Sequence, residues 1–316
     1  MNRKEFLTRL EAALATLSYE ERQAALRYYE EYLWDAGEEN EAAAIAELGA
    51  PEALAERIIR ESRAYAKESA NAEAQPGMNG SRPVSPFTSI NVDLANAAVT
   101  LYKGEAYSVA LDFPEAYPLP DVEVRDGTLH IKEKKFSHFS FFGFRSFGFI
   151  KKAEVIITLP DAQYERFAFD MVNGALKIPQ LRVRELKSDC VNGAVSITGV
   201  TAERIHLDNV NGKISASDVF AAESCKCDTV NGGIELSGVL RGRIHADAVN
   251  GGISISIPLS GKDYNLSLST VSGSVRVNGQ KMGKSFNVQN GAANSVHAET
   301  VNGGIQVGFQ SGTIVL

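Results

Sequence analysis

Six acidic residues recur in the second half of the chain, each three residues before an asparagine, and the first five lie 19, 19, 20 and 19 residues apart. They are Asp170, Asp189, Asp208, Asp228, Asp247 and Glu299. If they sat on strands stacked about 4.8 Å apart, they would form an acidic rail with the chemistry to bind Ca²⁺. Calcium usually takes about 6–8 oxygens from a wrapped loop. A solvated rail, or one that caps the following turn, is therefore the favoured interpretation.

Histidine and cysteine, the other residue types that ligate metals, also fall in this region. His206 and His245 share an outward position but lie two coils, about 10 Å, apart, which is too far to share a metal ion. Cys225 and Cys227 alternate along one predicted strand, so both thiols are expected in the core together with Cys190. No catalytic residue, cofactor site or metal site is predicted, and the chain is not expected to be an enzyme.

The elements that position these residues are set by a repeated tripeptide, Val-Asn-Gly. The asparagines of its first five copies lie 19, 19, 20 and 19 residues apart, which is typical of solenoid coils. Apolar residues alternate on both sides of each copy, as in strands with one buried face. The sequence predicts a mainly β protein, a single-stranded parallel β-solenoid (β-helix-like) with about 19-residue coils over residues 166–307.

The Asn-Gly pairs are expected at the corners of the coils. Glycine is expected to supply a positive φ there, and each asparagine amide to bond to the coils on both sides in a buried ladder. The predicted ladder residues are Asn173, Asn192, Asn211, Asn231, Asn250 and Asn302. A polar ligand-binding stripe on these asparagines is the less favoured alternative. The last repeat is longer, so a hairpin near residues 278–294 is expected, and either this hairpin or another subunit would cover the solenoid end.

Composition limits the class of protein. The 316 residues carry a net charge of −7 and three cysteines, which argues against a basic nucleic-acid-binding face and indicates a reducing compartment. Neither a signal peptide nor an apolar run of about 18 residues is present. These features predict a cytoplasmic protein, with contact at a membrane surface left open.

Residues 1–68 have the pattern of four short helices, and residues 69–86 that of a flexible linker to a β-domain at 87–316. Residues 1–70 hold 15 acidic and 9 basic residues, so they carry most of the net negative charge. Tyr28, Tyr32 and Trp34 could contact a protein partner or pack inside the bundle.

A phenylalanine-rich segment interrupts the β pattern between residues 136 and 149, with seven of the chain's 15 phenylalanines. It would either dock on a membrane surface or a partner, or fold over the solenoid. The residues proposed as partner contacts are Phe141, Phe142, Phe144 and Phe147.

Two family resemblances follow from these motifs. The stretches SINVDLANAAVTL, VEVRDGTLHIKEK and AEVIITLP, with the Val-Asn-Gly coils, resemble the bacterial putative-adhesin family of β-strand repeats over about 87–316. The stretches LSYEERQAALRYYEEYLWDAGEE and AIAELGAPEALAERII resemble the HAAS helical signalling domain over about 1–68. The second resemblance implies a PadR-type transcriptional regulator as a partner, although the membrane helices of many relatives are absent here.

These observations favour a non-enzymatic signalling scaffold, in which the helical module binds a regulator and the solenoid presents a binding face. The alternative is a cell-surface adhesin or glycan-binding β-solenoid. A polysaccharide-active enzyme on a β-helix is a remote third hypothesis, because such enzymes need paired carboxylates in a groove built by long loops.

Overall fold

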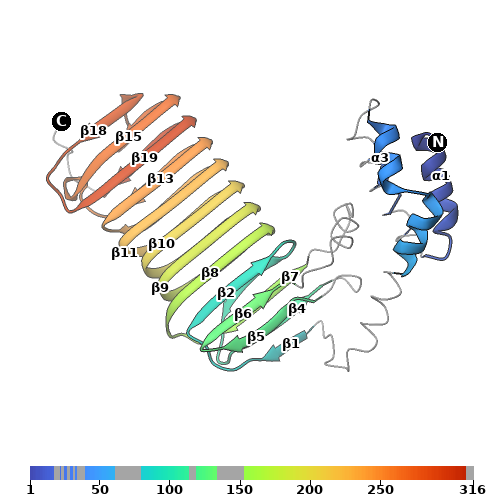
Figure 1. Ribbon diagram of the computed structural model, residues 1–316. Coiled ribbons are helices and arrows are strands. Elements are labelled where there is room, and N and C mark those ends of the chain that lie inside the picture. The colour runs from blue at the N-terminus through green and yellow to red at the C-terminus, as the bar shows by residue number, and fades with distance from the viewer. Residues whose placement is uncertain are drawn as a thin grey trace. The chain divides into compact units, whose positions relative to one another are not determined.

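The computed structural model describes residues 1–17, 22, 25–26, 29–30, 33, 40–60, 80–113, 119–133 and 153–310. These residues fall into two compact units, a helical one up to residue 60 and a β-rich one from residue 80 (Figure 1). The predicted order, a few helices followed by a mainly β body, is confirmed.

The helical unit contains α1 (Arg3–Ala13), α3 (Glu41–Leu48) and a helical stretch over residues 51–60. Helix α1 begins at Asn2, whose side-chain oxygen accepts a hydrogen bond from the Glu5 backbone at 2.9 Å, as an N-cap does. The described residues show three continuous helical segments, not the four predicted, because most of the predicted second helix lies outside them. Buried apolar side chains from the unit share one core, among them Phe6, Leu10, Leu14, Leu33 and Leu54.

The regular part of the β-rich unit is a stack of parallel coils, here called the coil stack. Its strands are β8 (Gln163–Asn173), β9 (Leu176–Asn192), β10 (Val195–Asn211), β11 (Ile214–Asn231), β12 (Ile234–Leu240), β13 (Arg243–Asn250) and β14 (Ile253–Ile257). Equivalent positions pair, so that Asn211 lies beside Asn192 on one side and Asn231 on the other. Since strand side chains alternate between faces, this register puts the apolar columns in a continuous core.

The coils do not stack in chain order at either end. The coil of β2 (Ser89–Leu94) and β3 (Ala98–Lys103) lies between that of β6 (Thr128–Lys132) and β7 (Glu154–Leu159) and that of β8 and β9. The coil of β19 (Asn294–Asn302) and β20 (Ile305–Phe309) lies between β13–β14 and that of β15 (Tyr264–Ser272) and β16 (Val275–Val277). Figure 1 shows β19 between β13 and β15.

Antiparallel strands cover both ends, so the sheet is not wholly parallel as predicted. At one end β4 (Ser108–Asp112) pairs with β7, β5 (Asp121–Arg125) with β6, and β1 (Gly80–Pro83) with β4. Residues 80–83 were predicted as linker and instead form this strand. At the other end β17 (Gln280–Gly283) and β18 (Ser285–Val288) pair with β16 and β15. The predicted hairpin thus covers an edge that would otherwise present unpaired backbone groups.

The three cysteines are free and buried, as predicted. Cys225 and Cys227 are 0% exposed, and the contact with Cys225, together with burial, holds the pKa of the Cys227 thiol well above its ordinary value. Such thiols act as small apolar core residues. No helix among the described residues is long and apolar enough to cross a membrane.

Candidate functional site

One long face of the coil stack gathers the repeated polar residues. It is formed by β8, the second halves of β9, β10 and β11, and then by β13, β19 and β15 in spatial order. Five columns run along this groove face, each with one residue per coil. They are a basic column, the acidic column, a buried floor column, a valine stripe and the asparagine ladder.

The valine of each Val-Asn-Gly copy points outward. These valines are 36–41% exposed in the regular coils, and Val271 of the variant copy is 64% exposed. They form a stripe: Val172, Val191, Val210, Val230, Val249, Val301 and Val271. Sequence reasoning did not assign this stripe, although the alternation of Asp, floor residue and valine would have revealed it. It is the most regular exposed apolar feature among the described residues.

A shallow groove of about 650 Å³ lies between the acidic column and the valine stripe. Its floor consists of short buried side chains, most of which hydrogen-bond to backbone carbonyls of the neighbouring coil. Asn209 donates to the Gly193 carbonyl at 2.7 Å, and Thr300 donates to the Gly251 carbonyl at 2.8 Å. These bonds pair the donor groups of the floor, whereas Asn209 Oδ1 is buried without a donor among the described residues.

The repeated glycines are needed for a reason that differs from the predicted one. Among the glycines that close these tripeptides, Gly193 alone has a positive φ, of 151°. The constraint is instead a close approach between coils, because a Cβ on Gly232 would overlap the Gly212 carbonyl oxygen. Gly212, Gly251 and Gly303 face the same conflict with the neighbouring coil. Glycine is thus required by packing of backbone on backbone.

The predicted ladder asparagines donate along the stack, each from Nδ2 to the Oδ1 of the previous coil's residue. The distances are 2.8 Å from Asn192 to Asn173, 2.9 Å from Asn211 to Asn192, and 2.8 Å from Asn302 to Asn250. Asn96, which the sequence did not single out, begins the ladder by accepting from Asn173 at 2.7 Å. The ladder is mostly exposed and not buried as expected, because the corner itself faces solvent.

The acidic column does not stand alone, because the residue two positions earlier on most strands is a lysine or histidine. This basic column contains Lys187, His206, Lys226, His245 and His297. Lys187 Nζ lies 2.6 Å from the Asp189 carboxylate, and this hydrogen bond raises the pKa of Lys187. Likewise, the bond to Asp228 raises the pKa of Lys226. These cations offset the repulsion that a bare row of carboxylates would suffer.

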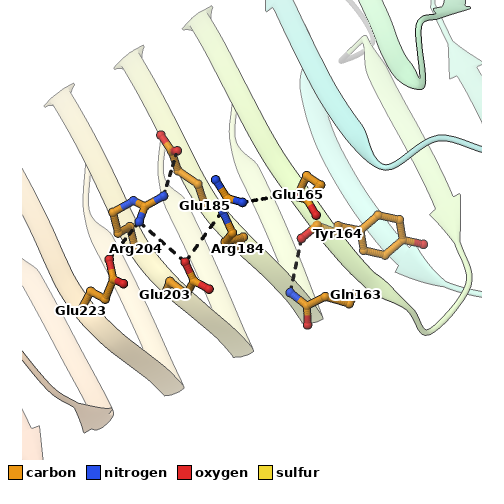
Figure 2. A network of polar contacts seen from close by, with 8 residues as sticks. All are labelled: Gln163, Tyr164, Glu165, Arg184, Glu185, Glu203, Arg204 and Glu223. Carbon is orange, nitrogen blue, oxygen red and sulfur yellow. Dashed lines mark hydrogen bonds and ion pairs between the residues drawn. The ribbon is translucent and has the colours of Figure 1, made fainter.

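Another edge of the same coils carries a different set of charges, here called the Arg–Glu corner (Figure 2). Arg204 lies 2.9 Å from Glu223, 3.6 Å from Glu185 and 3.7 Å from Glu203. Arg184 lies 3.3 Å from Glu165 and 3.8 Å from Glu203. These side chains are substantially exposed. They therefore form a solvated ladder of ion pairs and do not enclose a binding site.

The remaining predicted contact residues cannot be placed on this face. Tyr28, Tyr32, Trp34, Phe141, Phe142, Phe144 and Phe147 all lie outside the described residues. The candidate site therefore consists of the groove face alone, with the asparagine ladder at its edge.

Residues 87–242 match the Toastrack DUF4097 family model. Residues 5–57 match the HAAS family model. These two matches confirm both predicted resemblances. The Toastrack match includes the first four Val-Asn-Gly copies and ends before the displaced coil of β19 and β20.

The similar solved structures each cover 73–74% of this chain. A putative adhesin from Bacteroides fragilis is 16% identical with a TM-score of 0.41, over 74% of this chain and 98% of that one. A putative cell adhesion protein from Clostridium sporogenes is 16% identical with a TM-score of 0.36, over 73% and 98%. A putative adhesin from Parabacteroides distasonis is 14% identical with a TM-score of 0.36, over 73% and 95%. No curated protein matches the chain.

Proposed function

We propose that the chain is a non-enzymatic interaction scaffold whose Toastrack region and following coils form a single-stranded parallel β-solenoid that binds a protein partner along its groove face. The valine stripe carries this proposal. Contiguous exposed apolar side chains rimmed by polar ones mark interaction surfaces, and this stripe continues across seven neighbouring coils beside an open groove.

The charge of the groove face indicates what kind of segment it binds. Six carboxylates line the groove, and two lysines stand beside them. With neutral histidines the face therefore carries an excess of negative charge, which favours a partner that combines apolar and basic side chains. An extended segment fits a shallow groove that follows the stack better than a bulky domain does.

The helical unit is proposed to bind a second partner, a transcriptional regulator of the PadR type. Support for this part comes from the HAAS match over residues 5–57 and from the acidic excess of residues 1–70. The scaffold would then connect a segment held by the groove with a regulator held by the helices, in the cytoplasm.

Photo-crosslinking in the full-length chain tests the groove. A photoreactive residue at Val210, which is 40% exposed on the groove face, should capture a specific partner segment. The matched control is the same residue at Phe220, which is 38% exposed and belongs to neither the groove nor the stripe. Adding Val230→Lys should abolish the crosslink from Val210, because a lysine places a hydrated charge in the apolar stripe. Equal capture from both sites, or capture that survives Val230→Lys, would refute the groove as the binding face.

A further inference from the structure

We propose that His245, Asp247 and His297 bind a divalent transition-metal ion of the Zn²⁺ class on the groove face. This inference does not depend on the proposed partner. Sequence reasoning predicted no metal site because it compared His206 with His245, which are two coils apart. The sequence pattern alone does not show that β19 pairs with β13, which places His297 next to His245.

The two imidazoles come from adjacent strands and face each other. Their ring centroids are 5.0 Å apart and the ring planes differ by 9°. His245 Nε2 lies 2.9 Å from Asp247 Oδ2, and one ligand atom from each of the three residues falls within 4.8 Å of the others. Zinc binds nitrogen and carboxylate oxygen at about 2.0–2.2 Å. The three side chains are partly exposed, so they have room to rotate toward a common ion.

The oxygens around this pair have unused bonding capacity. Asp247 Oδ1 and Asp228 Oδ1 are shielded from solvent and have no hydrogen-bond donor among the described residues. Asp228 Oδ1 lies 3.8 Å from His245 Nε2. A shielded carboxylate oxygen without a donor costs free energy. A cation held by the Asp247 carboxylate would lower that cost and would attract the Asp228 carboxylate on the neighbouring strand.

A second cluster in the same columns shows why this position is the better one. His206, Asp208 and Asp228 also bring three ligand atoms together, but Lys226 already supplies a cation there. Its ammonium group contacts the Asp228 carboxylate and lies 3.4 Å from His206 Nε2. At the proposed site His245 has Lys226 on the neighbouring strand on one side and His297 on the other. The site therefore has two imidazoles, and no lysine lies between them.

The donor set selects the class of ion. Imidazole with carboxylate suits Zn²⁺ and its neighbours in the transition series, whereas Ca²⁺ and Mg²⁺ require oxygen ligands. With three protein ligands at a partly exposed site, a fourth coordination position is left for solvent or for Glu299. The Oε1 atom of Glu299 lies 3.6 Å from His297 Nε2. A bound ion would join two coils whose ligands lie 52 residues apart in the chain (297 minus 245).

Isothermal titration of the full-length protein with ZnCl₂ in a non-chelating buffer tests the site. The parent should bind about one ion per chain through these three ligands. His297→Ser should weaken binding by about tenfold or more, because one of three protein ligands is lost. Serine suits the position, since Ser267 occupies it in the next coil. The matched control is His206→Ser, in the same column but in the lysine-filled cluster, and it should bind as the parent does.

Thermal unfolding with and without Zn²⁺ gives a second measurement. Zn²⁺ should raise the midpoint temperature of unfolding of the parent and of His206→Ser but not that of His297→Ser, since a ligand stabilises only the state that binds it. If His297→Ser fails to fold, Asp247→Asn serves in its place with the same expected loss. No Zn²⁺ uptake by the parent, equal losses in both histidine variants, or a preference for Ca²⁺ over Zn²⁺ would each overturn the proposal.

Discussion

Two corners of the same coils repeat along the stack, yet different forces hold them. At the Asn–Gly corner, neighbouring backbones approach so closely that a Cβ has no room, and amide side chains bond from coil to coil. At the Arg–Glu corner, long exposed side chains form ion pairs between coils. The first arrangement changes in one copy only, where Ser272 stands at the asparagine position, whereas the second is interrupted at Ser224, which pairs with Arg204.

The difference shows what makes a repeat regular in sequence. A close backbone approach tolerates one residue type at a position, so glycine recurs in every Val-Asn-Gly copy and also in the variant copy. Exposed ion pairs tolerate many residue types, since each contributes little to stability. A strict sequence repeat therefore marks a geometric constraint, and it does not by itself mark a binding site.

The largest expected effect comes from adding one methyl group at the Asn–Gly corner. Gly232→Ala places a Cβ against the Gly212 carbonyl oxygen, and overpacking of this kind should lower the free energy of unfolding by about 2–3 kcal/mol. The matched control is its neighbour, because a Cβ on Gly233 would lie 3.4 Å from the Gly252 carbonyl oxygen, an ordinary contact. Urea unfolding should separate the two variants clearly. Equal stabilities would mean that the close approach does not constrain the residue.

Removing one ladder amide should cost less. Asn211→Ala removes the bond donated to Asn192 at 2.9 Å and the bond accepted from Asn231 at 2.8 Å. Because the ladder is exposed and water can replace these bonds in part, the expected loss is about 1 kcal/mol. Asn287→Ala serves as the control, since that exposed side chain accepts a single bond from Gln289 at 3.2 Å. If the two variants are equally stable in urea, the ladder adds no stability.

Extending the ladder should produce a gain of similar or smaller size. Ser272 pairs with Asn302 in the last copy, and asparagine at this position could donate to Asn302 Oδ1. Ser272→Asn should therefore raise the free energy of unfolding by about 0.5–1 kcal/mol. Ser272→Asp has nearly the same shape but no amide donor, so it should give no gain. A midpoint in urea that is the same for both variants would contradict this expectation.

The smallest effect is expected at the Arg–Glu corner. Arg204→Ala removes contacts to three glutamates, but these pairs are exposed and screened, so the thermal midpoint should fall less than in Asn211→Ala. The fall should disappear in about 1 M NaCl, where the Debye length is about 3 Å. Arg276→Ala is the control, since that side chain contacts a carbonyl oxygen at 3.5 Å. A salt-insensitive loss would show that Arg204 contributes through packing.

The repeat predicted much of this architecture. Alternation on either side of Val-Asn-Gly identified the buried columns, and the spacing indicated which asparagines would lie together. The order of coils at the two ends could not be predicted in the same way. Every coil edge offers the same backbone groups, so nothing in the pattern of β19 shows that it pairs with β13 and not only with β15.

The candidate site was predicted less completely, and for the same reason. The acidic column was recognised, but its lysine and histidine partners depend on which strands are adjacent. His297 lies 30 positions after Ser267 and 52 after His245 (297 minus 267 and 245), yet it is next to both. The role of the glycines was also misjudged, because a spacing pattern cannot distinguish a special φ from a close backbone approach.

The displaced coils at the two ends have a mechanical consequence. The coil of β19 and β20 is the last in the described chain, yet it is hydrogen-bonded on both sides, as the coil of β2 and β3 is at the other end. Tension applied to the segment after β20 would therefore load two ladders at once and could not unzip an outermost layer. At the other end β1 precedes the coil of β2 and β3 and pairs only with β4 among the described strands, so this strand would separate first.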